Sequence, residues 1–245
     1  MTSVTGRCSV GVFMVLLLGI PVGAAAQVSA GDRVDLVRKW VAATRQLADA
    51  QSAMAAPPNA DSPNVNTAIR GQMTANRQAL VRIDAAGALL PSAAQYPTGS
   101  PEREVLDAYR NILTSLRDAL NEQHAIDTEM TSLEGLAFIQ ASGGLMERIF
   151  KVRGDLAEIW GRLAPATEML AKTMVDTERL TDGRVQHLRI TASERADLLR
   201  VITSAFPAVK TRVTDEPSES VGAIAKFTAV LTGALRSADA AEWTP

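Results

Sequence analysis

The residues best suited to chemistry by type and spacing lie together near the C-terminal third of the chain. His187 is one of only two histidines, and charged side chains surround it in sequence. If this connector is extended, alternate residues point to opposite sides, with His187 and Arg189 facing away from Leu188 and Ile190. We expect the two apolar side chains to anchor the connector to the core. A candidate partner-binding edge is then formed by the polar residues Asp182, Arg184, His187 and Arg189. The open alternative is a solvated corner that binds nothing.

Two local structures are possible around Asp182-Gly183. A helix reaching about residue 180 could end with Gly183 in the left-handed conformation that glycine adopts readily. Alternatively, Asp182-Gly183 could be the two-residue turn of a β-hairpin. The prediction favours the helix end, because an isolated two-stranded hairpin is marginal in water.

The sequence offers few residues for binding a metal ion or for nucleophilic catalysis. The only cysteine, Cys8, lies before the apolar N-terminal run, so the chain after residue 26 has no thiol ligand, disulfide or lipid-acceptor cysteine. Glu122 and His124 are two positions apart, which on a helix turns them to different faces rather than toward one metal ion. We therefore predict no catalytic residues, no metal site and no cofactor.

Paired carboxylates are the remaining route to an enzyme. Two acids about 5 to 9.5 Å apart in a cleft lined by aromatic side chains could hydrolyse glycosidic bonds. Most acids, however, fall at predicted helix starts or four residues from Lys or Arg, and Trp40 and Trp160 lie on apolar seams. A cell-wall or polysaccharide hydrolase is kept as the alternative function.

The first 26 residues have the pattern of a secretory signal peptide. Arg7 precedes an apolar run from Val10 to Ile20, and Ala24-Ala25-Ala26 ends it with small residues. We expect cleavage after Ala26, with an uncleaved anchor as the alternative, and no transmembrane segment afterwards. Without Arg7, 24 basic and 27 acidic residues remain, a net charge of about −3 that offers no basic field for nucleic acid.

Apolar residues recur at spacings of three and four along most of the remaining chain, which predicts helices. Prolines at 57, 58, 63, 91, 97 and 101 separate the first three, and Ser100-Pro101 begins the third. That helix is expected to fade near residues 124–127, and later breaks or kinks are expected at Gly143-Gly144 and Pro165. Thr191 to Glu194 reads as a capping box that begins a short helix. Residues 218–235 are apolar nearly all round, which predicts a buried helix or, alternatively, one that docks on a partner.

The predicted fold is therefore all-α, an antiparallel bundle of about six to seven helices. Residues 27–180 would form the bundle, and residues 181–245 a connector and two C-terminal helices packed on the same core. The functional expectation is an exported, non-enzymatic protein, periplasmic or extracellular, that binds a protein partner or small ligand in the cell envelope. The partner's identity and the oligomeric state stay open at this point.

Overall fold

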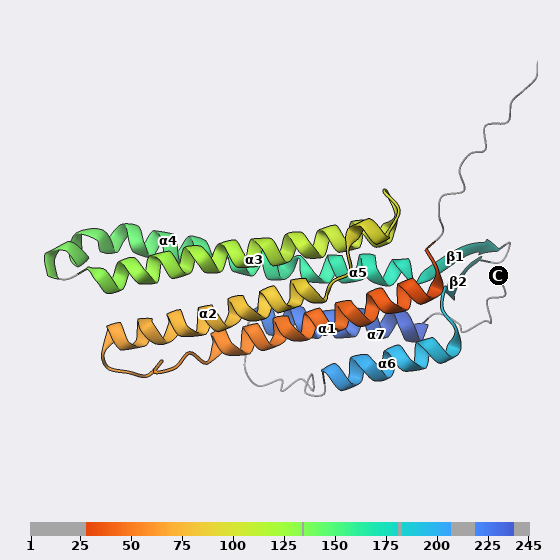
Figure 1. Cartoon of the computed structure of the whole chain (residues 1–245), viewed down its shortest axis with the longest axis horizontal. Coiled ribbons are helices and arrows are strands. Elements are labelled where there is room, and N and C mark those ends of the chain that lie inside the picture. The colour runs from red at the N-terminus through yellow and green to blue at the C-terminus, as the bar shows by residue number, and fades with distance from the viewer. Residues whose placement is uncertain (1–27, 134, 181–182, 207–218, 238–245) are drawn as a thin grey trace, which may run out of the picture.

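The computed structural model describes residues 28–133, 135–180, 183–206 and 219–237, and the expected signal peptide lies outside this part of the chain. Helices dominate it, so the all-α class is confirmed (Figure 1). In chain order the elements are α1 (Ala30–Ala55), α2 (Val65–Leu89), the 3-10 helix η1 (Ala93–Gln95), α3 (Pro101–Ser132), α4 (Gly135–Gly161), α5 (Leu163–Thr173), β1 (Val175–Leu180), β2 (Gly183–Leu188), α6 (Ala192–Ala205) and α7 (Glu219–Ser237).

Short polar side chains begin the helices as the sequence predicts. The Ser100 side chain accepts a hydrogen bond from the Arg103 amide, and Pro101 takes the first helical position of α3. Thr191 and Glu194 form a capping box at the start of α6. A second capping box, which was not predicted, begins α1 at Ser29 and Asp32. Each cap satisfies amides that have no partner within the helix.

The main core runs through both the N-terminal and the C-terminal helices. Trp40 of α1 stacks on Tyr109 of α3 with ring centroids 4.2 Å apart, and the Tyr109 hydroxyl lies 3.0 Å from the Thr44 hydroxyl. Phe227 of α7 is fully buried and meets Phe206, which follows α6, edge to face. The helix α7 is therefore a buried element of this core, which is the first of the two alternatives that its sequence left open.

One ion pair lies inside the core near the start of α3. Arg33 Nε of α1 donates to Glu102 Oε1 at 2.9 Å, and Glu102 is only 2% exposed. Tyr96 is buried close by, and burial together with the charges of Asp35, Asp32 and Glu102 raises the pKa of its hydroxyl to about 12. These contacts tie the first turns of α1 and α3 together.

The expected helix breaks are only partly correct. α3 continues without interruption through residues 124–127, and α4 continues through Gly143-Gly144. The helix does break at Arg162, and Pro165 falls in the first turn of α5, where a missing amide hydrogen leaves no helical bond unmade. No helix in the described part of the chain is long and apolar enough to cross a membrane.

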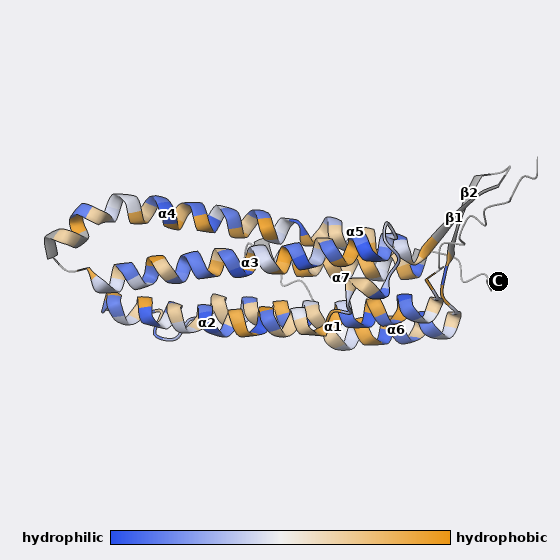
Figure 2. Ribbon diagram, turned by 45° about the horizontal axis from the view of Figure 1, so that its top comes forward, coloured by the Kyte–Doolittle hydropathy of each residue, from blue (hydrophilic) through white to orange (hydrophobic). Residues whose placement is uncertain are grey.

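The predicted helix end at Gly183 is wrong, because residues 175–180 and 183–188 pair as the two antiparallel strands of a hairpin at one end of the bundle (Figures 1 and 2). An isolated two-stranded hairpin is marginal in water, but the base of this hairpin is attached to the core. Val175 packs against that core, Leu188 is buried in it, and the Arg189 amide donates to the Met174 carbonyl at 2.7 Å. The core thus stabilises the pairing.

Candidate functional site

The four residues singled out from the sequence are placed to different degrees. Asp182 lies outside the described residues, and for Arg184 and His187 the structure describes the backbone, in β2. The strand register sets Arg184 opposite Arg179 and His187 opposite Asp176. Arg189 follows the strand and is half-buried rather than exposed. A binding edge here stays a prediction, whereas the predicted anchors Leu188 and Ile190 are confirmed as core residues.

A different surface stands out on α4. Ile139, Met146 and Phe150 are 68%, 44% and 61% exposed, although each is a large apolar side chain. Their spacings of seven and four place them on one face of the helix, since each residue advances about 100°. We call these three residues the α4 stripe. In both views α4 runs along the outer edge of the bundle (Figures 1 and 2).

Another face of α4, roughly 110° around the helix from the stripe, is already used for packing. Leu145, Ile149 and Val152 are buried against Ile126 of α3 in a small core that is separate from the main one. We call this pair of helix ends, with its own small core, the α3–α4 tip. Among the described residues, its side chains come from α3, α4 and Leu133 between them. The α4 stripe therefore adds a second apolar face to a helix whose first face is satisfied.

Sequence reasoning found only the buried face. Leu145, Ile149 and Val152 recur at spacings of four and three, which defines one apolar face of a helix. The second row was visible in the same stretch as Ile139, Met146 and Phe150 at helical spacing. Two apolar rows on one helix indicate either burial on two sides or a docking surface.

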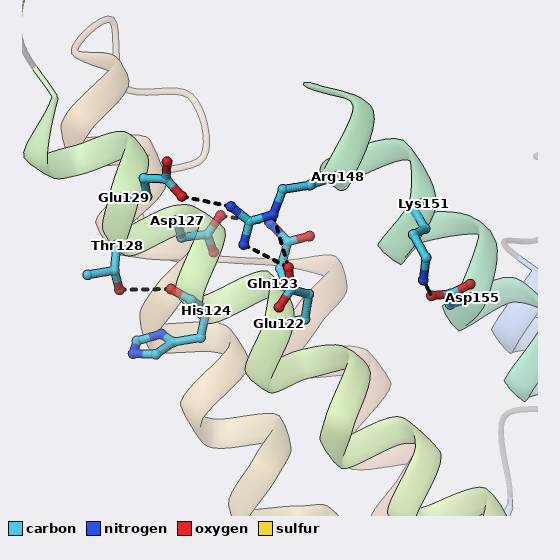
Figure 3. A network of polar contacts seen from close by, with 9 residues as sticks. All are labelled: Glu122, Gln123, His124, Asp127, Thr128, Glu129, Arg148, Lys151 and Asp155. Carbon is cyan, nitrogen blue, oxygen red and sulfur yellow. Dashed lines mark hydrogen bonds and ion pairs between the residues drawn. The ribbon is translucent and has the colours of Figure 1, made fainter. Parts of the chain in front are cut away.

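A buried polar layer joins α2 to α3 near the tip (Figure 3 shows its α3 residues). Asp127 is 4% exposed and accepts hydrogen bonds from Gln123 Nε2 at 2.7 Å and from Asn76 Nδ2 at 3.3 Å. Asn76 in turn accepts from Gln72 Nε2 at 2.9 Å. Burial raises the pKa of Asp127 above its ordinary value, while the Gln123 hydrogen bond and the nearby His124 act in the opposite direction. The layer explains why α3 continues through residues where its apolar pattern fades.

Ion pairs occupy the outer surface beside this layer. Arg148 of α4 reaches Glu122 and Glu129 of α3, each at 2.7 Å, while His124 points away from them (Figure 3). A shallow groove of about 360 Å³ follows between α3 and α4, with four acids in its lining: Asp118, Glu122, Asp155 and Glu158. Three of these acids have basic partners, namely Arg148, Lys151 and Arg162. None of the lining residues is aromatic.

Asp127→Asn is expected to change how stability depends on pH. Because burial raises the Asp127 pKa in the folded protein, the folded state binds this proton more tightly than the unfolded chain. Its stabilising contribution is present below the unfolded pKa and is lost as pH rises through the folded pKa. The difference in free energy of unfolding, wild type minus variant, should therefore fall as pH rises from about 3 to about 8. Urea unfolding followed by circular dichroism measures it.

The matched control is Asp118→Asn, an exposed acid on the same helix. For this variant we expect a pH profile parallel to that of the wild type. If the difference in free energy of unfolding between the wild type and Asp127→Asn did not change with pH, burial would not raise the pKa of Asp127.

Comparisons with known proteins give no relative to argue from. No family model matches the chain, and no curated protein or solved structure is detectably similar to it. Within the described residues, no three His, Cys, Asp or Glu side chains are grouped so as to hold a metal ion. The surface of the molecule is therefore the basis for a functional argument.

Proposed function

We propose that the chain is an exported, non-enzymatic helical bundle that binds a protein partner in the cell envelope through the α4 stripe. The observation that carries the proposal is the exposure of Ile139, Met146 and Phe150 on one face of an outer helix. The signal-peptide pattern of residues 1–26 supports export and a periplasmic or extracellular location.

Packing among the residues that the structure describes gives no reason for this face to be apolar. The three side chains together expose on the order of 300 Å², the scale at which apolar patches on monomers mark interaction sites. Single exposed apolar residues also occur elsewhere, for example Val65 and Val81 on α2, 16 positions apart. On α4, by contrast, three large side chains follow one helical row. Such a row is the pattern by which helices dock on one another or in grooves.

The acids between α3 and α4 favour binding over hydrolysis. A retaining or inverting glycosidase needs two carboxyl groups free to exchange protons, close to aromatic side chains that hold sugar. In this groove Glu122, Asp155 and Glu158 are held by basic side chains. Ion pairs of this exposed kind are typical of a solvated surface.

Site-specific crosslinking in the envelope tests the proposal. A photoreactive phenylalanine analogue at position 150 should give a discrete adduct with a protein, because the stripe would be covered by its partner. The same analogue at Val81, which is 67% exposed on α2, is the matched control and should give none. Equal labelling at both positions, or no adduct at 150, would show that the stripe is not a docking surface.

A further inference from the structure

The α4 stripe is nearly symmetric along the helix. Met146 and Phe150 lie two positions before and after Arg148, and Ile139 and Ala157 lie nine positions before and after it. Gly143 and Gly154 lie five and six positions away, and a Cβ at either would meet nothing within 4 Å. Reversing the direction of the helix therefore superposes Met146 and Phe150 on each other near the centre. Beyond it the two glycines come close together, and the large Ile139 meets the small Ala157.

We propose that the stripe binds the same stripe of a second copy, with the two α4 helices antiparallel about a two-fold axis near Arg148. This inference rests on the proposed function, because it names the partner of the same surface. A two-fold interface requires a surface complementary to itself, and the symmetric stripe meets that requirement. Met146 and Phe150 would pack against their counterparts, while Gly143 would face Gly154 of the other copy and allow the backbones to approach.

Charges beside the stripe complement one another in the same arrangement. Glu147 and Lys151 are both exposed and lie on the same flank, one turn apart. In an antiparallel pair about a two-fold axis, each flank faces the same flank of the other copy. Glu147 then lies within about 3 Å, measured along the axis, of Lys151 in the second copy, and this attractive contact occurs twice. The two copies of Glu147 come equally close to each other, but this repulsive contact occurs only once. In the single chain Lys151 bonds Asp155 at 2.6 Å, an exposed pair that is weak enough to rearrange.

Arg148 does not oppose this pairing, although the axis passes near it. Its guanidinium is directed toward α3, where it bonds Glu122 and Glu129 (Figure 3). Arg153 is the other exposed base beside the stripe, and it would face the region of Gly143 rather than a second base. The arrangement therefore brings no two bases into contact.

The size of the surface predicts a weak dimer. Stable complexes bury about 800 Å² on each partner, and one helix face with three exposed apolar side chains is smaller than that. A dissociation constant on the order of 10 µM is expected, so the dimer would be sensitive to concentration. Local concentration in the envelope would then determine how much of the chain is paired.

Sedimentation equilibrium of the purified chain in its exported form tests the inference. We expect the wild type to pass from monomer to dimer as its concentration rises, and Phe150→Glu to dimerise at least tenfold more weakly. Phe150 is 61% exposed, so circular dichroism and the melting temperature should be nearly unchanged. Met146→Lys is the second disrupting variant, and Val81→Glu, on α2, should dimerise like the wild type.

Charge exchange tests the antiparallel contact itself. Glu147→Lys and Lys151→Glu should each weaken self-association several-fold, because like charges would then face one another across the axis. Mixing the two variants should restore pairing as a heterodimer, in which every facing pair is opposite in charge. A mixture that stays monomeric would overturn the proposed pairing.

The outcomes separate this inference from the proposed function. A chain that stays monomeric at all accessible concentrations, or an unaffected Phe150→Glu dimer, overturns pairing through the stripe. If the chain is monomeric but position 150 crosslinks to a different protein, the docking surface stands and its partner is not a second copy. If position 150 crosslinks to nothing, the proposed function itself fails.

Discussion

Arg33→Met is expected to lower the free energy of unfolding by about 3–5 kcal/mol, the typical cost of removing one partner of a buried ion pair. Glu102 is 2% exposed and accepts from Arg33 Nε at 2.9 Å, so the variant leaves a carboxylate inside the core without its base. Methionine matches the arginine side chain as far as Nε, so the apolar stem is kept while the charge and the hydrogen bond to Glu102 are lost. Urea unfolding followed by circular dichroism measures the change.

Two further variants isolate the buried charge as the cause. Lys39→Met removes the base of an exposed pair with Asp35 on the same helix, and we expect a change below about 1 kcal/mol. The double variant Arg33→Met with Glu102→Met should recover most of the stability, because no unpaired charge is left. A double variant as unstable as Arg33→Met would contradict the electrostatic explanation.

Gly71→Ala is expected to destabilise the protein by about 2–3 kcal/mol or more, although alanine is the better helix former. Gly71 lies on α2 where the α1–α2 loop crosses it, and a Cβ there would fall 1.6 Å from the Pro58 carbonyl oxygen. That neighbour is backbone and cannot rotate away as a side chain could. The loop must shift, and thermal unfolding should show a lower melting temperature.

Gly144→Ala is the matched control for this clash. Gly144 is also inside a helix, but a Cβ there meets nothing within 4 Å. The same substitution should stabilise the protein by about 0.5–1 kcal/mol through helix propensity alone. If Gly71→Ala destabilises the protein and Gly144→Ala stabilises it, the contact with Pro58 is the cause of the loss. If both variants change stability in the same direction, the contact with Pro58 is not the cause.

The fold could be predicted from sequence wherever a local rule agreed with the packing. Apolar periodicity identified α1, α2 and α7, and short polar side chains marked the starts of α3 and α6. These signals depend on the residues of a single element and its caps. These signals predict the right elements because the core buries the same helix faces that the periodicity defines.

Predictions failed where a distant contact decided the outcome. The fading pattern near Asp127 suggested a break in α3, but Asn76, 51 residues away in sequence, helps to satisfy the buried carboxylate. The hairpin of β1 and β2 forms because Val175 and Leu188 meet the core at its base. The α4 stripe was missed for another reason: it became distinctive only once the structure showed which face of α4 was buried.

The small core of the α3–α4 tip has a consequence for the motions of the molecule. Its buried side chains come from two helices and are separate from the large core that holds the other elements together. Segments with few buried apolar contacts open locally at a lower free energy than the whole domain. The tip is thus the part of the bundle best able to open on its own, and it carries the α4 stripe. A molecule bound at the stripe would make this local opening rarer. Its binding would then increase the protection of the α3 and α4 amides from hydrogen exchange, even without a change of shape.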